Sequence, residues 1–122
     1  MSIEDLKVIE AINALVKDIY KVTLKYPKNE EFGLISQMRR AAISIGSNLM
    51  EGNYRGSTKD YVHFIDIAKG SAAELKYQLL ISKELKYISE KEQEILDKKI
   101  EEIIKTLSSI KRALKKKLED KG

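Results

Sequence analysis

Residues 26–64 read YPKNEEFGLISQMRRAAISIGSNLMEGNYRGSTKDYVHF, and the turn signals in this stretch decide the fold class. Pro27 is the only proline of the chain, and the residue before a proline is disfavoured in a helix, so a preceding helix is predicted to end at Tyr26. The glycine-flanked turn GNYRG at residues 52–56 closes a second segment. Between these two signals, the pattern predicts a helix over residues 33–52.

The helix predicted over residues 33–52 has an apolar stripe at helical spacing, made of Met38, Ala42, Ile45 and Leu49. Gly46 lies inside this helix, where a glycine costs roughly 1 kcal/mol relative to alanine. We therefore expect either a bend in the helix or the close approach of a neighbouring helix at Gly46. The sequence is compatible with both.

Outward from this helix, three further segments show the same periodicity, over residues 3–26, 58–87 and 90–119. Each has a continuous apolar stripe that predicts a buried face. The positions on these stripes are Val8, Ile12, Leu15, Ile19, Val22 and Tyr26, then Tyr61, Ile65, Ala68, Ala72, Leu75 and Leu79, then Leu96, Ile100, Ile103, Leu107, Ile110 and Leu114.

Two serine and acid pairs mark the starts of the last two helices. Ser57 is followed by Asp60, and Ser89 is followed by Glu92, so both pairs have the spacing of a capping box. Short connections and apolar residues at every third or fourth position predict antiparallel neighbours. We therefore predict one domain over residues 1–122, an all-α, up-and-down antiparallel four-helix bundle.

The composition limits the chemistry available to the chain. It has 122 residues, 43% of them hydrophobic, which is enough to bury one core without disulfides. There is no cysteine and a single histidine, His63, so disulfides, thiolate sites and multi-histidine metal sites are excluded. The sequence shows neither an apolar run of about 18 residues nor a signal-peptide pattern, so we expect a cytoplasmic protein without a membrane partner.

The excess positive charge is confined to the last part of the chain. The formal net charge is +4, and the last twelve residues, KRALKKKLEDKG, carry six cations and two acids, so the remainder is neutral overall. A polyanion can contact several such cations at once, and each neutralised phosphate adds salt-dependent affinity. The alternative is a solvated helix end whose cations complement the helix dipole. The nucleic-acid candidates in this segment are Lys111, Arg112, Lys115, Lys116 and Lys117.

Three further arginines are candidates for contact with nucleic acid. Arg55 lies in the GNYRG turn, where free backbone N–H groups can hold a phosphate, although a turn that simply needs glycine is the alternative. Arg39 and Arg40 precede a small, polar helix face. Two interpretations apply to them: contact with nucleic acid, or an ion pair that fixes the register of helices in an interface.

The first predicted helix has an apolar arc wider than the roughly 100° that a simple core contact needs. This width indicates contact with another subunit, and the polar face of the second helix extends the predicted interface. The alternative is that the first helix is the central helix of a monomeric core. The candidates for the oligomer interface are Ile9, Val16, Ser44, Ser47, Asn48 and Glu51.

No catalytic constellation is found in the sequence. Asp66 follows His63 at i+3 and can orient an imidazole, but no nucleophile or second acid completes a site. The acids of residues 84–94 alternate with lysines, which is typical of a solvated helix face. They also lack the Glu-x-x-His motif of di-metal bundles. We therefore expect no enzyme activity, no cofactor and no metal site.

Several blocks of the sequence resemble one known family. The blocks are QMRRAA at residues 37–42, Ser47-Asn48 with Glu51-Gly52, and Gly70-Ser71 through Glu74-Leu75 to Gln78-Leu79-Leu80. In combination they resemble the small four-helix-bundle proteins encoded in intervening sequences of 23S ribosomal RNA genes, and the resemblance runs from residue 5 to residue 89. It implies a four-helix bundle that assembles as a homopentamer. Two positions depart from the family's pattern, since Gly46 stands where proline is usual and Ile9 where tryptophan is common.

A related branch of this family accompanies reverse transcriptases in diversity-generating retroelements and binds nucleic acid through a basic outer surface. The resemblance therefore implies an accessory or scaffold protein without catalysis. Its implied partners are further copies of the chain, RNA or DNA, and a protein such as a reverse transcriptase. The alternative function is a structural protein–protein interaction module with no nucleic-acid role.

Overall fold

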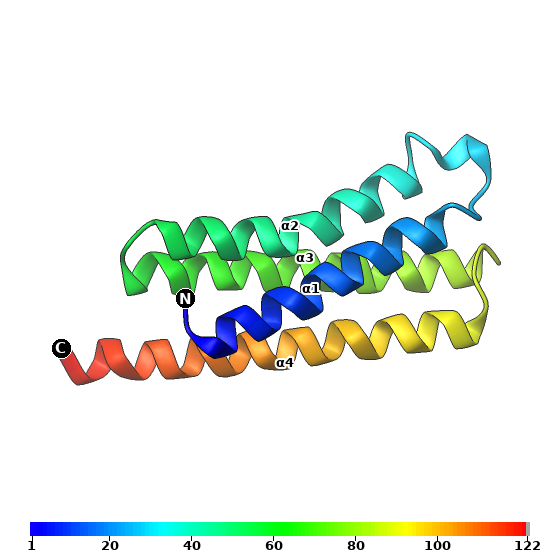
Figure 1. The fold of residues 1–122 in the computed structure, drawn as a ribbon. Coiled ribbons are helices and arrows are strands. Elements are labelled where there is room, and N and C mark those ends of the chain that lie inside the picture. Colours follow the sequence, from blue (N-terminus) through cyan, green and yellow to red (C-terminus); the bar gives the residue numbers. More distant parts are fainter. Residues whose placement is uncertain (122) are drawn as a thin grey trace.

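The computed structural model describes residues 1–121 as an all-α, antiparallel four-helix bundle, which confirms the predicted fold class (Figure 1). Successive helices run up and down; α1 packs against α2 and α4, and α3 packs against the same two helices from the other side. Gly122 and the side chain of Lys121, which belongs to the basic segment, lie outside the described residues. The helices are α1 (Ile3–Thr23), α2 (Leu34–Tyr54), α3 (Thr58–Glu84) and α4 (Glu90–Lys121), with a short 3-10 helix, η1 (Lys28–Glu30), between the first two.

The core consists of the apolar stripes that the periodicity predicted. Every predicted inward residue from Val8 to Ile110 is buried, and Leu114 is partly buried against the same cluster. Removing such side chains from water stabilises the fold by about 1.5–3 kcal/mol for each large aliphatic residue. Amphipathic spacing alone therefore accounts for which face of each helix points inward.

The first helix ends three residues before the predicted boundary. α1 stops at Thr23, and the chain continues in a tighter turn in which the N–H of Lys25 donates to the Val22 carbonyl and the N–H of Tyr26 donates to that of Thr23. These i to i−3 bonds are the 3-10 type that commonly finishes a helix. Tyr26 is still buried, with its ring centroid 5.2 Å from that of Tyr87.

The third helix also ends three residues early, at Glu84. Lys86 has a φ of 65°, the left-handed conformation that reverses a chain after a helix. The N–H of Lys86 donates to the Lys83 carbonyl, and the N–H of Tyr87 donates to the Ser82 carbonyl. This pattern is a Schellman motif, with lysine at the position usually occupied by glycine. The absence of glycine explains why the sequence pattern extended this helix too far.

Two of the serine caps form complete boxes. The Glu92 N–H donates to Ser89 Oγ at 3.0 Å, while the Ser89 N–H donates to a Glu92 carboxylate oxygen at 2.9 Å. A second complete box, Ser2 with Asp5, starts α1 and was not predicted from the sequence. At Ser57 the structure describes only the bond from the Asp60 N–H, so half of the predicted box is formed there.

Two glycines of α2 lie against neighbouring helices. A Cβ at Gly46 would lie 3.4 Å from Ile12 Cγ2 of α1, and one at Gly52 would lie 2.5 Å from Phe64 Cβ of α3. Figure 1 also shows α2 changing direction near its middle, so that its N-terminal half diverges from α3. The bend therefore agrees with one of the two expectations for Gly46, whereas the close approach of a neighbouring helix is found at Gly52.

Candidate nucleic-acid interface

The C-terminal part of α4 presents four exposed cations: Arg112, Lys115, Lys116 and Lys117. We call them the C-terminal cations. Within the described residues, none of them forms an ion pair. Lys111 differs, because its Nζ donates to Asp66 Oδ1 of α3 at 2.7 Å and thereby ties α4 to the bundle. Of the five candidates in this segment, four are therefore exposed and unpaired among the described residues, and Lys111 has a structural role.

The end of α4 extends past the rest of the bundle. Figure 1 shows its last turns continuing beyond the start of α1 and the connection between α2 and α3. Leu114 is the last residue of α4 that packs against the core, and Leu118 is exposed. Within residues 1–121, no neighbouring helix therefore covers the last turns of α4, where cations also complement the helix dipole.

Arg39 has a defined structural role. Its Nε donates to Thr23 Oγ1 at 3.0 Å, and its Nη2 donates to the Tyr20 carbonyl at 3.2 Å. The guanidinium carbon lies 4.5 Å from the centre of the Tyr20 ring, within cation–π range. Arg39 therefore links α2 to the last turn of α1, while its side chain stays partly exposed.

The other two candidate arginines lie on different surfaces. Arg40 is exposed and borders a shallow polar groove between α2 and α3, together with Ser71 and Glu74. Arg55 donates to Glu51 at 3.1 Å and lies 5.0 Å from the Phe64 ring centre. The candidate cations of the sequence are thus distributed over several faces of one protomer.

Part of the polar stripe predicted for an interface is satisfied inside the protomer. Ser44 Oγ lies 2.9 Å from Ser71 Oγ of α3, and Asn48 Nδ2 donates to both the carbonyl and the Oγ of Ser44. Glu51 is paired with Arg55. These polar residues therefore connect α2 to α3 and to its own following turn.

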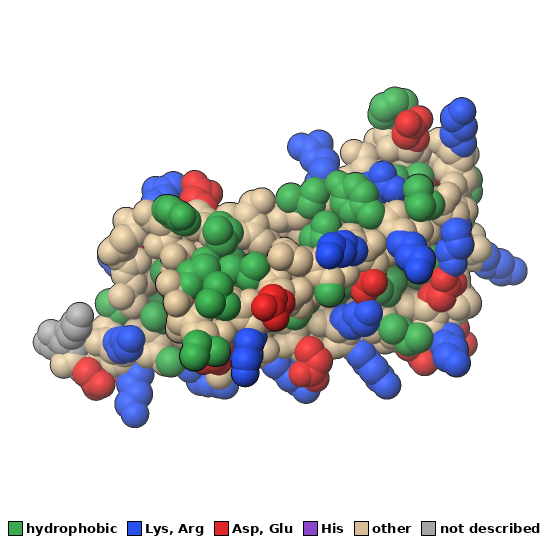
Figure 2. Space-filling model, in the orientation of Figure 1, with side chains coloured by type: hydrophobic (Ala, Val, Ile, Leu, Met, Phe, Trp, Pro, Cys, Tyr) green, Lys and Arg blue, Asp and Glu red, His purple; other side chains and the backbone are tan. Residues whose placement is uncertain are grey.

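The remaining interface candidates, Ile9, Val16 and Ser47, line a groove of about 680 Å³ between α1 and α2. Two exposed residues of α2 border the same groove, Ile43 at 44% and Met50 at 41%. Figure 2 shows hydrophobic side chains gathered over α1 and α2 on this face. A contiguous apolar patch of this kind is typical of a surface that another molecule covers.

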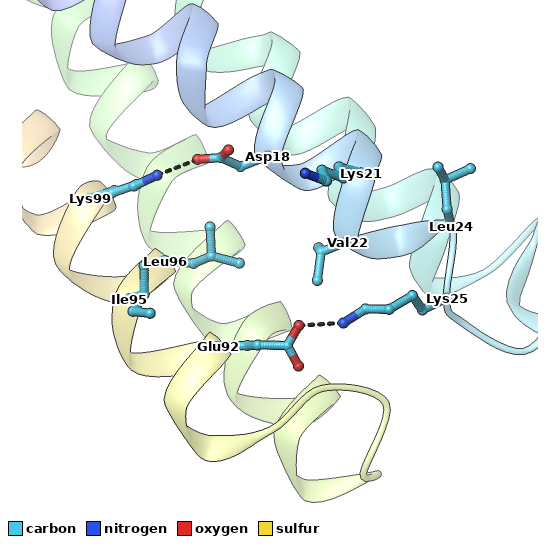
Figure 3. A pocket seen from close by; sticks show the side chains of 9 residues that line it. All are labelled: Asp18, Lys21, Val22, Leu24, Lys25, Glu92, Ile95, Leu96 and Lys99. Carbon is cyan, nitrogen blue, oxygen red and sulfur yellow. Dashed lines mark hydrogen bonds and ion pairs between the residues drawn. The ribbon is translucent and has the colours of Figure 1, made fainter.

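A second groove, between α1 and α4, was missed by the sequence analysis (Figure 3). It has a volume of about 460 Å³ and an apolar floor of Val22 and Leu96. Lys99 donates to Asp18 at 2.7 Å on one side, and Lys25 pairs with Glu92 on the other. Part of a signal was present in the sequence, because Lys21 and Lys25, which both line this groove, are four residues apart.

The ion pair at this groove changes the acidity of Glu92. Its hydrogen bond with Lys25, helped by the bond from the Ser89 backbone N–H, lowers the pKa of Glu92 below the ordinary 4.5. Glu92 therefore takes part in two interactions, the cap that starts α4 and the ion pair that joins α4 to the chain that follows α1.

The residues considered for catalysis are engaged in packing. Asp66 is bonded to Lys111, and the His63 ring packs edge-on against Phe64 with centroids 5.5 Å apart. In the part of the chain that the structure describes, no group of three or more His, Cys, Asp or Glu side chains is placed to hold a metal ion. Of the helices described, none combines the length and the apolar character that crossing a bilayer requires.

Comparisons with known proteins identify related sequences and folds. A family model described as "23S rRNA-intervening sequence protein" matches residues 4–109. A solved structure from Bacteroides thetaiotaomicron, described as a protein with unknown function from the S23 ribosomal protein family, is 26% identical and has a TM-score of 0.82; the match covers 90% of this chain and 99% of that chain. No curated protein matches the chain.

Proposed function

The chain belongs to the family of 23S rRNA-intervening sequence proteins, and from this premise we propose that it is a non-catalytic, oligomeric accessory or scaffold protein that binds RNA or DNA. The proposed contact is made by the C-terminal cations of α4. They lie beyond residues 4–109, which the family model matches, so their role is argued from their own charge and exposure. A cytoplasmic location is part of the same proposal.

The observation that carries the proposal is the distribution of charge. The net charge of +4 equals the excess of the last twelve residues, and the four C-terminal cations are exposed and form no ion pair among the described residues. Three other lysines of α4 are paired with acids: Lys99 with Asp18, Lys105 with Glu102 and Lys111 with Asp66. An unmatched cluster of cations favours a polyanion, because each phosphate contact releases counterions.

The shape of α4 supports the same conclusion. Its last turns extend beyond the other helices, so a nucleic-acid backbone can approach them from several directions (Figure 1). Glu119 and Asp120 follow the cations and reduce the local charge, which limits the expected affinity of a single protomer. Several protomers in one particle would present several such clusters to one nucleic acid, and multivalent contact raises apparent affinity.

We propose a cyclic homo-oligomer, most simply a pentamer, on two grounds. The family resemblance implies this assembly, and the apolar groove between α1 and α2 offers a surface for it. Ile43 and Met50 are more than one-third exposed in the isolated protomer, although both are large and apolar. Covering such side chains stabilises an assembly by about 25 cal/mol for each Å² of apolar surface.

The nucleic-acid proposal is tested by binding measurements on the full chain. Labelled single-stranded and duplex RNA are titrated with the wild type and with a variant that combines Lys115→Gln, Lys116→Gln and Lys117→Gln. The matched control combines Lys91→Gln, Lys98→Gln and Lys105→Gln, which removes the same charge from exposed positions elsewhere on α4. We expect weaker binding for the first variant alone. Equal affinity for all three proteins would refute the assignment to the C-terminal cations.

The alternative function, a protein–protein interaction module, is supported by the groove in Figure 3. Its apolar floor is flanked by Leu24 and Ile95, which are 76% and 47% exposed. If the wild type binds neither RNA nor DNA at low salt, the nucleic-acid proposal fails and this module becomes the better account of the chain.

A further inference from the structure

One face of the bundle gathers cations around an exposed tyrosine. We call it the Tyr20 surface; it consists of Lys17, Tyr20 and Lys21 on α1 and Arg39 on α2. Residues 34–50 of α2 contain no Asp or Glu, and the only acid in residues 11–26, Asp18 of α1, is bonded to Lys99 of α4. Figure 2 shows Lys and Arg side chains over this part of α1 and α2. The charge balance of the whole sequence conceals this local excess.

The centre of the Tyr20 surface is an ordered stack. The Arg39 guanidinium carbon lies 4.5 Å from the centre of the Tyr20 ring, and the guanidinium is held by bonds to Thr23 Oγ1 and to the Tyr20 carbonyl. Tyr20 is 38% exposed despite this contact. Aromatic rings and guanidinium planes are the groups on which unpaired bases stack. Because the stack exists before any ligand arrives, binding would not require these side chains to be ordered first.

Cations lie on both sides of the tyrosine along α1. Lys17, at the edge of the groove between α1 and α2, and Lys21, at the edge of the groove between α1 and α4, are exposed, and neither forms an ion pair among the described residues. Residues four apart on a helix are separated by about 6 Å along its axis, so the two ammonium groups can contact successive phosphates of one strand. A basic track with an aromatic platform is the arrangement that binds single strands without sequence preference.

We propose that the Tyr20 surface binds single-stranded RNA or DNA, with one base on the Tyr20 and Arg39 stack and the flanking phosphates at Lys17 and Lys21. Bases in a duplex are already paired and stacked, so a duplex cannot use the platform. This inference rests on the proposed function for the class of ligand, but it uses residues on a different face from the C-terminal cations.

The test compares a labelled oligouridylate with a labelled duplex RNA on the full chain. Tyr20→Leu removes the aromatic face and keeps apolar volume, Tyr20→Phe keeps the face, and Tyr77→Leu is the matched control at an exposed tyrosine of α3. We expect Tyr20→Leu to weaken oligouridylate binding by about fivefold or more and to leave duplex binding unchanged. Tyr20→Phe and Tyr77→Leu should bind both probes like the wild type.

The outcomes separate this inference from the proposed function. If Tyr20→Leu and Tyr77→Leu bind oligouridylate equally, the Tyr20 surface is not used, even where the C-terminal cations still are. If the wild type binds neither probe, both proposals are wrong. Should Tyr20→Leu fail to fold, Lys17→Gln with Lys21→Gln replaces it. This pair should reduce the salt dependence of oligouridylate binding by a slope of about 1.4, and an unchanged slope would overturn the inference.

Discussion

At the scale of single residues, Gly52 shows how closely α2 and α3 approach. A Cβ at this position would lie 2.5 Å from Phe64 Cβ and 3.1 Å from Tyr61 Cδ1. The Phe64 Cβ is attached directly to the backbone, so it can move only if α3 moves. We therefore expect Gly52→Ala to lower the free energy of unfolding by about 1–3 kcal/mol, the usual cost of overpacking, in urea denaturation.

Gly46 provides the matched control in the same helix. A Cβ there would meet only Ile12 Cγ2, at 3.4 Å, which is an ordinary contact. Gly46→Ala should therefore raise the free energy of unfolding by up to about 1 kcal/mol through helix propensity. Loss of stability in Gly46→Ala as large as that in Gly52→Ala would show that α2 needs glycine for its bend and would contradict this account.

The sequence could predict which residues carry candidate chemistry, but not what each of them contacts. The polar face of α2 was identified from helical spacing, whereas the bond between Ser44 and Ser71 joins residues 27 positions apart on different helices. Arg39 and Thr23 are similarly separated. Such pairings depend on how helices are placed against each other, and local periodicity carries no information about that placement.

At the scale of elements, the start of α4 predicts a pH dependence. Bonding to Lys25 lowers the pKa of Glu92, so this carboxylate binds its proton less readily in the folded state than in the unfolded one. A lowered folded-state pKa means that the stabilisation is present above pH 4.5, the ordinary value, and is lost as the pH falls through the folded-state pKa. Acid should therefore weaken the cap and the contact between α1 and α4 together.

Urea unfolding of wild type and Glu92→Gln at about pH 6 and about pH 3 measures this effect. Because Glu92 is partly solvated, we expect the variant to lose only about 0.5 kcal/mol at the higher pH, the size of an exposed ion pair. At the lower pH the two proteins should have similar stability. Glu94→Gln is the control at an exposed acid of the same turn. An equal deficit for Glu92→Gln at both pH values would rule out the linkage.

Helix positions followed from the sequence because each helix has a continuous apolar stripe. The ends were less predictable where the stop signal was unusual. Lys86 adopts the left-handed conformation that sequence rules reserve for glycine, so the predicted end of α3 was three residues too late. Pro27 placed the predicted end of α1 at Tyr26, but a tight turn ends the helix earlier, at Thr23, while Tyr26 keeps its place in the apolar stripe.

At the scale of the whole molecule, the exposed apolar groove between α1 and α2 predicts self-association. Sedimentation of the wild type at micromolar concentration should give about five times the mass of one chain. Ile43→Glu places a charge in the groove at a residue that is 44% exposed, so it should shift the particle to smaller species without unfolding the protomer.

Ile95→Glu is the control, because Ile95 is 47% exposed but lies in the groove between α1 and α4. This variant should keep the size of the wild type. A wild type that sediments as a monomer would contradict the assembly, and an Ile43→Glu particle of unchanged size would show that the groove is not the interface.

The bundle itself was predictable, because short connections between amphipathic helices allow few arrangements. The charge of each surface of the bundle was less predictable. A count of charges over the first 110 residues gives neutrality, yet folding pairs Asp18 with Lys99 of α4 and leaves Lys17 and Lys21 of α1 exposed and unpaired among the described residues. A segment that is neutral overall can therefore have locally charged surfaces, because folding places its acids and its cations on different faces.

Nucleic-acid binding by the C-terminal cations is tested by the salt dependence of the affinity. The dissociation constant for a duplex DNA is measured from about 50 mM to about 200 mM salt for the wild type and for the variant with Lys115→Gln, Lys116→Gln and Lys117→Gln. Phosphate contact predicts affinity that falls linearly on logarithmic axes, with a slope smaller by about 2–3 in the variant. Affinity that is independent of salt, or a slope that is the same in both proteins, would contradict nucleic-acid binding by the C-terminal cations.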